Sequence, residues 1–332
     1  MRMPFSHLPG VAARKVRGLS RRLERRIPGR AAVLAYHRVA CPAVDPWDLA
    51  VTPTNFEAQL DVLCDTGKVR QLHELLGESA TTRMRKRVVQ FAITFDDAYV
   101  DNLEEALPLL ESFDAPATVF VAPGLLGRSS FWSDVLAELV LGSGLEACRV
   151  LGAARETGIL NGDESMERVH PDARCALDLL YGRLILRHVD AIESDLGRLA
   201  EELGVELPVP HSRPMTVSEL TALAAHPLIT IGVHTMTHPL LPSLSIASVR
   251  AGIGESAQQL DELVGVEHRV LAYPYGASSK AVVDVARKLG FDHAVTTQSG
   301  WLSRRGDGLT TPRLHAPDVD GPTLAEWLWR WA

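Results

Sequence analysis

The chain has 332 residues and the composition of an ordinary globular protein, with 46% hydrophobic, 23% charged and 6% aromatic residues. Its net charge of −7 argues against nucleic acid as the main partner, because nucleic-acid binding depends on the neutralisation of phosphates. No apolar run approaches the roughly 18 residues that a membrane-spanning helix requires.

Residues 1–30 form a basic tail. They contain nine Lys or Arg and one acid, Glu24, so the tail carries +8 and the remaining residues carry −15. Such a tail is typical either of a solvated, partly helical arm or of a segment attracted to an anionic membrane surface or a polyanion.

Two features bear on the compartment. The tail contains no apolar core of about 7–15 residues, as a secretory signal would, so we expect a cytoplasmic protein, associated with the membrane at most peripherally through the tail. The cysteines are far apart and form no Cys-x-x-Cys pair, which predicts reduced thiols at Cys41, Cys64, Cys148 and Cys175.

Strands and helices alternate after the tail. Residues 31–39 (AAVLAYHRV) and 87–99 (RVVQFAITFDDAY) are short apolar, β-branched runs that predict buried strands. Between them, apolar residues recur at helical spacing. Thr54, with Glu57 three residues later, is the predicted N-cap of that helix.

A helical stretch interrupts this alternation. After a predicted helix at 102–116 and a strand at 117–123, residues 132–205 are helical in composition and contain no clear strand. The alternation then returns, with helices near 245–264 and 278–289 and strands near 228–234, 269–276, 293–297 and 310–317. Six or seven strands with parallel crossovers predict a closed or distorted (β/α) barrel, with the helical insertion over one rim.

Three predicted strands end in polar groups, and sites in parallel α/β folds form at the carboxyl ends of strands. The first ends in Asp96 and Asp97, whose mutual repulsion requires a cation or a proton. The second, IGVHTMTH, ends in His234 and His238, which either share a face of a helical turn or meet through a tight turn. Two neutral imidazoles and one carboxylate form a catalytic zinc site with an open position.

The third strand ends in LAYPYG, a turn that can direct a backbone N–H at a developing oxyanion. Each pattern alone has a simpler explanation: surface histidines, a helix N-cap, or a turn with packed aromatics. All three patterns after buried strands, in this order, favour a common site. His37, at the end of the first predicted strand, could line it, although a place in the core is the simpler expectation.

The sequence resembles the polysaccharide deacetylases of the NodB-homology type (carbohydrate esterase family 4). The resemblance rests on VLAYHRV, TPTNFEAQLDVL, TFDDAYVDNLEEALPLLESFDAPATVFVAPG, FWSDVLAELV, IGVHTMTHPLLPSLS and LAYPYGASS, in that order, and covers roughly 31–315. It implies a distorted (β/α)7 barrel of the NodB type over residues 31–332. It also implies metal-dependent removal of acetyl groups from an N-acetylated or O-acetylated sugar of a glycan or glycolipid precursor.

The resemblance also implies roles for single residues. The metal, most simply zinc, would be held by Asp97, His234 and His238. Asp96 would be the general base that deprotonates the attacking water, and the backbone N–H of Tyr275 would stabilise the oxyanion. His315 is the candidate acid for the leaving amine.

Two positions depart from the family pattern. Ala272 stands where well-studied members have an arginine that orients the base, and Ala98 follows the aspartate pair where glycine is usual. Arg313 and His315 are the nearest candidates to restore the missing functions, although a strand-end turn explains them equally well. Two alternatives therefore stay open: a catalytically silent glycan-binding protein on the same fold, which Ala272 motivates, and a hydrolase of a non-sugar amide or an ester.

Overall fold

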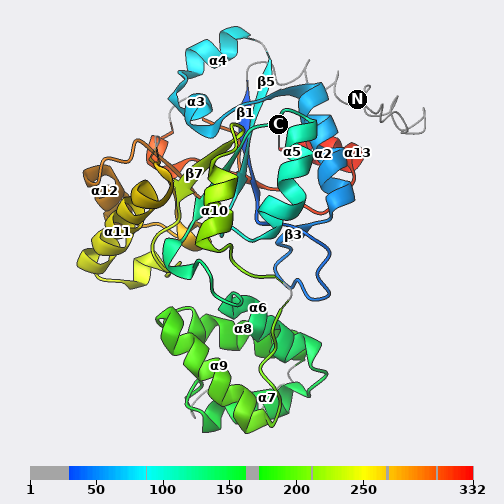
Figure 1. Cartoon of the computed structure of the whole chain (residues 1–332), viewed down its shortest axis with the longest axis vertical. Coiled ribbons are helices and arrows are strands. Elements are labelled where there is room, and N and C mark those ends of the chain that lie inside the picture. The colour runs from blue at the N-terminus through cyan, green and yellow to red at the C-terminus, as the bar shows by residue number, and fades with distance from the viewer. Residues whose placement is uncertain are drawn as a thin grey trace.

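A curled parallel sheet surrounded by helices forms the larger part of the molecule, and a bundle of short helices forms the smaller part (Figure 1). The computed structural model describes residues 30–86, 88–161, 172–210, 212–266, 269–303 and 306–331. The predicted basic tail lies outside the described residues except for Arg30.

The main sheet has the strand order β10-β1-β5-β6-β7-β8-β9, and neighbouring strands along it are parallel. The strands are β1 (Ala31–Tyr36), β5 (Val89–Phe95), β6 (Ala117–Val121), β7 (Ile229–Val233), β8 (Val270–Ala272), β9 (His293–Val295) and β10 (Leu314–His315). The two ends of the sheet approach each other, since Val295 forms a bridge with Thr311, just before β10. The predicted fold class, a distorted barrel of the NodB type, is confirmed.

Three short strands lie outside this path. β4 (Gly67–Val69) pairs with the start of β5, and β2 (Arg38–Val39) and β3 (Ala50–Val51) form a separate two-stranded sheet. The first predicted strand, 31–39, is therefore interrupted at His37, which belongs to neither β1 nor β2.

The register of the sheet determines which polar residues lie next to each other at the ends of neighbouring strands. Tyr36 pairs with Phe95, so the residues that follow, His37 and Asp96, leave β1 and β5 side by side. Every residue of β1 and β5 is buried, as expected for parallel strands that are covered on both faces.

The helices that cover the sheet include the four that the sequence predicted, after residue 54 and at 102–116, 245–264 and 278–289. The covering helices are α2 (Pro53–Thr66), α3 (Leu72–Gly77), α4 (Ala80–Lys86), α5 (Leu107–Ser112), α10 (Val217–Ala224), α11 (Ile246–Val264), α12 (Lys280–Lys288) and α13 (Gly321–Arg330). The prediction of Thr54 as N-cap is wrong. Thr52 caps α2 instead, accepting from the N–H of Asn55, because Pro53 with its fixed φ occupies the first helical position.

The helical bundle lies between β6 and β7 in the sequence. Its helices are α6 (Trp132–Ala137), the π-helical turn η3 (Glu138–Gly142), α7 (Ala147–Glu156), α8 (Ala173–Leu184) and α9 (Val189–Leu203). These helices occupy the stretch 132–205 that we call the insertion, and its described residues contain no strand. The insertion has a hydrophobic core of its own, which includes Leu139, Leu177, Leu180, Leu196 and Leu199.

Two sequence-based expectations concern the whole chain. All four cysteines are free thiols, as predicted. Across the residues that the structure describes, we find no helix with the length and apolar character needed to span a membrane.

Candidate metal and catalytic site

The predicted site residues meet in one cavity of about 290 Å³ at the carboxyl ends of the strands. Those that line it are Asp96, Asp97, His234, His238, Tyr275 and His315. They come from segments that follow β5, β7 and β8, and from β10. The structure therefore brings together every residue that the sequence analysis selected.

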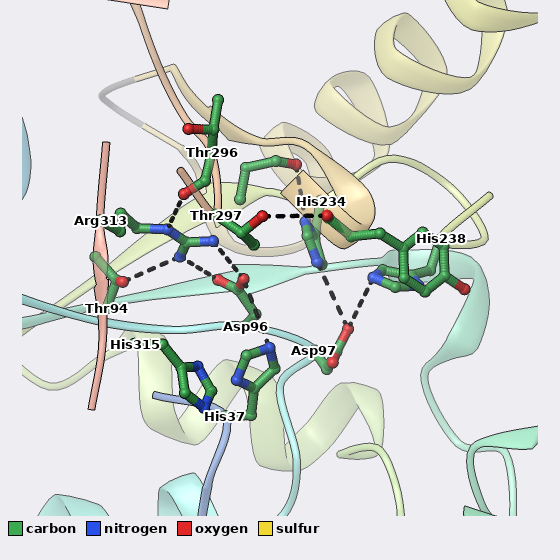
Figure 2. Close-up of polar contacts among 12 residues, drawn as sticks. His37, Thr94, Asp96, Asp97, His234, His238, Thr296, Thr297, Arg313 and His315 are labelled. Carbon is green, nitrogen blue, oxygen red and sulfur yellow. Dashed lines mark hydrogen bonds and ion pairs between the residues drawn. The ribbon is translucent and has the colours of Figure 1, made fainter. Parts of the chain in front are cut away.

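Asp97 faces both histidines (Figure 2). Its Oδ1 lies 3.6 Å from His234 Nε2 and 3.4 Å from His238 Nε2. One ligand atom from each of the three side chains lies within 4.8 Å of the others. Ligands about 2.0–2.2 Å from a tetrahedral zinc ion are roughly 3.3–3.5 Å apart, so this spacing fits a shared ion.

The protonation of His234 supports this fit. Its Nδ1 lies 2.8 Å from the carbonyl oxygen of Ala272, which can only accept, so Nδ1 carries the proton. Burial lowers the pKa of His234, so its Nε2 presents a lone pair to Asp97. The Oδ1 of Asp97 is buried and has no hydrogen-bond partner among the described residues. Two acceptors that face each other in a buried site require a proton or a metal ion between them, and burial together with the charge of Asp96 raises the pKa of Asp97.

Backbone strain is concentrated at this site. Seven non-glycine residues in the described part of the chain have positive φ, and five of them are Asp97, Ala98, Thr235, His238 and Tyr275. Each costs on the order of 1–3 kcal/mol, and such residues gather where function fixes the backbone. The segment 234–238 is not helical and bends at Met236 and Thr237, which decides between the two geometries that the sequence left open.

Asp96 is held by a buried arginine. Arg313 donates from Nη1 to Oδ1 at 2.7 Å and from Nη2 to Oδ2 at 2.6 Å. The same guanidinium also donates to the carbonyl of Thr296 and to the hydroxyl of Thr94 (Figure 2). Burial alone would raise the pKa of Asp96, but the charge and hydrogen bonds of Arg313 outweigh burial and hold it well below its usual range. Asp96 is therefore a carboxylate.

A pair of imidazoles lies beside Asp96. The ring centroids of His37 and His315 are 5.6 Å apart, and His37 Nε2 lies 3.9 Å from Asp96 Oδ2. His315 is farther out and donates from Nε2 to the carbonyl of Asp48. Burial lowers the pKa of His37 to about 3, so this ring is neutral near pH 7.

His37 lines the cavity. The sequence analysis considered this position but favoured a place in the core. The signal was the position of His37 directly after a strand that neighbours the strand of Asp96. That relation needs the strand order, which the sequence does not give. The aromatic residues Trp132 and Tyr181 of the insertion also line the cavity and had no recognisable sequence signal.

Comparison with known proteins identifies a family pattern in two segments. The family model described as polysaccharide deacetylase matches residues 83–146 and 197–294. The unmatched stretch between them contains α7, α8 and the start of α9, all within the insertion. YxkH of Bacillus subtilis, named as a candidate polysaccharide deacetylase, is 20% identical to this chain. The alignment spans 277 residues, which are 83% of this chain and 68% of YxkH.

Solved structures share the fold. The Streptococcus pyogenes deacetylase PplD in complex with acetate has a TM-score of 0.58 and 18% identity, over 92% of this chain and 100% of that chain. IcaB from Ammonifex degensii has a TM-score of 0.56 and 19% identity, over 90% of this chain and 96% of that chain. Both are less than 20% identical to this chain, so these similarities are evidence for the fold alone.

Proposed function

Because the chain belongs to the polysaccharide deacetylase family, whose members hydrolyse N-acetyl amide bonds of sugars, we propose that it is a metal-dependent carbohydrate deacetylase. Its substrate would be an acetylated amino sugar of a glycan or glycolipid precursor. One observation supports this proposal above the others: a buried oxygen of Asp97 faces His234 and His238, next to a carboxylate that an arginine holds.

Asp97, His234 and His238 would hold the divalent ion. One carboxylate and two imidazoles suit zinc, and the carbonyl of Ala272 fixes the tautomer of His234 in the form that a metal requires. When bound, such an ion polarises a carbonyl group and lowers the pKa of a water molecule.

Asp96 would act as the general base. It accepts the proton of the water whose oxygen attacks the carbonyl carbon of the acyl group. Both of its oxygens bond to Arg313, but each has a second lone pair that remains available. The two hydrogen bonds from Arg313 fix the direction of those lone pairs and keep Asp96 ionised. The ionisation of Asp96 therefore does not change with pH in the neutral range.

The remaining steps need a donor to the oxyanion and a proton for the nitrogen. The backbone N–H of Tyr275, in a turn held at φ 58°, would donate to the oxyanion as it forms. The bond between the carbonyl carbon and nitrogen then breaks, and the nitrogen takes a proton. We assign this transfer to the imidazole pair of His37 and His315, which passes on the proton that Asp96 accepted from water; His37 Nε2 lies 3.9 Å from Asp96 Oδ2.

Ala272 no longer supports a catalytically silent glycan-binding protein. The guanidinium that this position lacks is supplied by Arg313, which forms a bidentate pair with Asp96. Ala272 contributes its carbonyl to His234 instead. We therefore retain the enzyme as the proposed function.

The proposal is tested by acetate release. Purified protein loaded with zinc is incubated with N-acetylglucosamine oligosaccharides and, separately, with O-acetylated sugars. We expect acetate and an equal amount of free amine from the first set, no acetate with Asp96→Asn, and unchanged zinc content in that variant. Asp284→Asn, which changes a partly exposed carboxylate on α12, is the control and should keep full activity. No acetate from either set would contradict the proposed function.

A further inference from the structure

The cavity is covered on one side by two segments that contact each other. One is the insertion, and the other is the loop 40–49 that joins β2 to β3. In Figure 1 this loop extends from the sheet toward α6 and α8. The ring centroids of Trp47 and Tyr181 are 4.9 Å apart, and Arg174 donates to the carbonyl of Pro46. The two segments thus meet over the site.

Tyr181, on α8, connects this cover to the catalytic loop. Its ring stacks on Trp132 at 5.1 Å with an interplanar angle of 25°. It meets the ring of Tyr275 edge-on at 6.5 Å. Tyr275 in turn lies 4.4 Å from the ring of His238. A chain of aromatic contacts therefore runs from the loop 40–49 to a residue beside Asp97.

The insertion is anchored where it joins the sheet. Asp134, in α6, accepts hydrogen bonds from the hydroxyl of Tyr99 at 3.2 Å and from the hydroxyl of Ser212 at 3.0 Å. Tyr99 precedes the insertion and Ser212 follows it, so one partly buried carboxylate ties both connections to α6. The cover consequently has a fixed position over the cavity.

These contacts limit what the cavity can admit. A unit in the middle of a polymer needs a groove that is open on both sides, so that the chain can continue in both directions. Here the contact between Trp47 and Tyr181 closes one side. The volume of about 290 Å³ is at the lower end of the range for small-molecule pockets, and the lining is mostly aromatic and apolar.

We propose that the cavity takes a single acylated amino-sugar unit at the end of a saccharide, and that Tyr181 is the residue that determines this specificity. This inference rests on the proposed deacetylase function. The acyl group points to Asp96 and Asp97, the sugar ring packs on the aromatic wall of the insertion, and the rest of the saccharide leaves through the open side. Internal units of a long polymer are excluded.

The test uses β-1,4-linked N-acetylglucosamine oligomers, from the disaccharide to the hexasaccharide, and a long soluble polymer of the same unit. Mass spectrometry of the fragments locates each free amine. We expect free amines on one terminal unit only, at a rate per chain that does not depend on chain length. Free amines on internal units would overturn the inference and leave the proposed function standing. No acetate from any oligomer would overturn both.

Two variants of Tyr181 separate the ring from its hydroxyl. Tyr181→Ala opens the cover, so kcat/KM for the disaccharide should fall by about tenfold or more, mainly through KM, and internal units should become substrates. Tyr181→Phe keeps the ring contacts and should keep the preference for the terminal unit. Trp329→Ala on α13, away from the insertion in Figure 1, is the control.

A second variant covers the case in which Tyr181→Ala does not fold. It changes Trp47, the other ring of the same contact. Trp47→Ala removes the ring that the loop 40–49 contributes, which packs against the core of the insertion but is not one of its buried residues. It should also admit internal units. A preference for the terminal unit that persists in both alanine variants would overturn the role of Tyr181.

Discussion

Arg313 and Asp96 form a buried bidentate ion pair although they are 217 positions apart in the chain. The guanidinium is 1% exposed, and each of its three nitrogens donates to Asp96, Thr94 or Thr296. A planar fork that binds both oxygens fixes the orientation of a carboxylate as a lysine cannot. The proposed base therefore receives its geometry from a residue at the far end of the sequence.

Arg313→Lys should lower kcat/KM by about 100-fold. The charge of lysine keeps Asp96 ionised, but a single ammonium group no longer holds the carboxylate in one orientation. Zinc content should not change, since the ligands are untouched. Steady-state kinetics and elemental analysis measure the two effects. Arg213→Lys, which disrupts a bidentate pair with Glu219 outside the cavity, is the matched control and should keep kcat/KM. Equal losses in both variants would contradict the role of Arg313.

Asp97→Asn should abolish zinc binding, whereas Asp96→Asn should preserve it, although the two residues are adjacent. Only Asp97 faces both imidazoles, at 3.4 and 3.6 Å. A ligand that binds the folded state alone stabilises it, so zinc should raise the Tm of the wild type and of Asp96→Asn. Thermal melts with zinc and with a chelator measure this. A zinc-dependent rise in Asp97→Asn would exclude the predicted ligand set.

His37→Gln and His315→Gln distinguish the two imidazoles. Protonation of the leaving group matters for an amide and hardly for an ester with an acidic alcohol, so the variant that lacks the acid should lose about 100-fold or more on the amide alone. Comparing kcat/KM for an N-acetylated sugar and an activated acetyl ester identifies that variant. If each variant loses the same factor on both substrates, neither imidazole is the acid.

Gly276→Ala should impair catalysis, because Gly276 has φ 65° and a Cβ there would lie 2.0 Å from the hydroxyl of Thr297. The clash would displace the neighbouring Tyr275 N–H, so kcat should fall by about tenfold or more. Gly290→Ala is the matched control, with φ 83° and nothing within 4 Å of the added Cβ. It should lose stability by about 1–2 kcal/mol from backbone strain and keep kcat. Equal kcat in the two variants would contradict this prediction.

Glu219 should make stability depend on pH in an acidic window. The hydrogen bonds of Arg213 lower the pKa of Glu219 from 4.5 to about 2. A folded-state pKa below the unfolded one means that the stabilisation is present above pH 4.5 and is lost as pH falls toward 2. Glu219→Gln should cost about 1 kcal/mol near pH 7, since glutamine can still close the capping box of α10 but lacks the charge that pairs with Arg213. Urea unfolding across this window should show the difference between wild type and variant shrinking; a constant difference would disprove the ion pair as its source.

Local patterns were enough to find the sheet and most of the site. Asp96, Asp97 and His234 were predictable because each follows an apolar, β-branched run, and the carboxyl ends of parallel strands lie at one edge of a sheet. His238 and Tyr275 lie close after such runs and were found with them. The helical insertion was visible because strand-like runs stop over a long stretch of sequence.

Other features depended on contacts that no local pattern encodes. Thr54 was a reasonable N-cap by its spacing to Glu57, but Pro53 moved the cap to Thr52. His37 lies beside Asp96 because of the register of β1 against β5. The order of strands along the chain does not specify that register.

The sequence by itself determined which residues could bind a metal and at which strand ends they stand, because hydrophobic periodicity and residue chemistry are local properties. Only the tertiary structure decided that Arg313 takes the place that Ala272 leaves empty, and that Tyr181 of the insertion closes the cavity. Both side chains reach the site across contacts between segments distant in the chain, and the closing of the barrel and the docking of the insertion fix those distances.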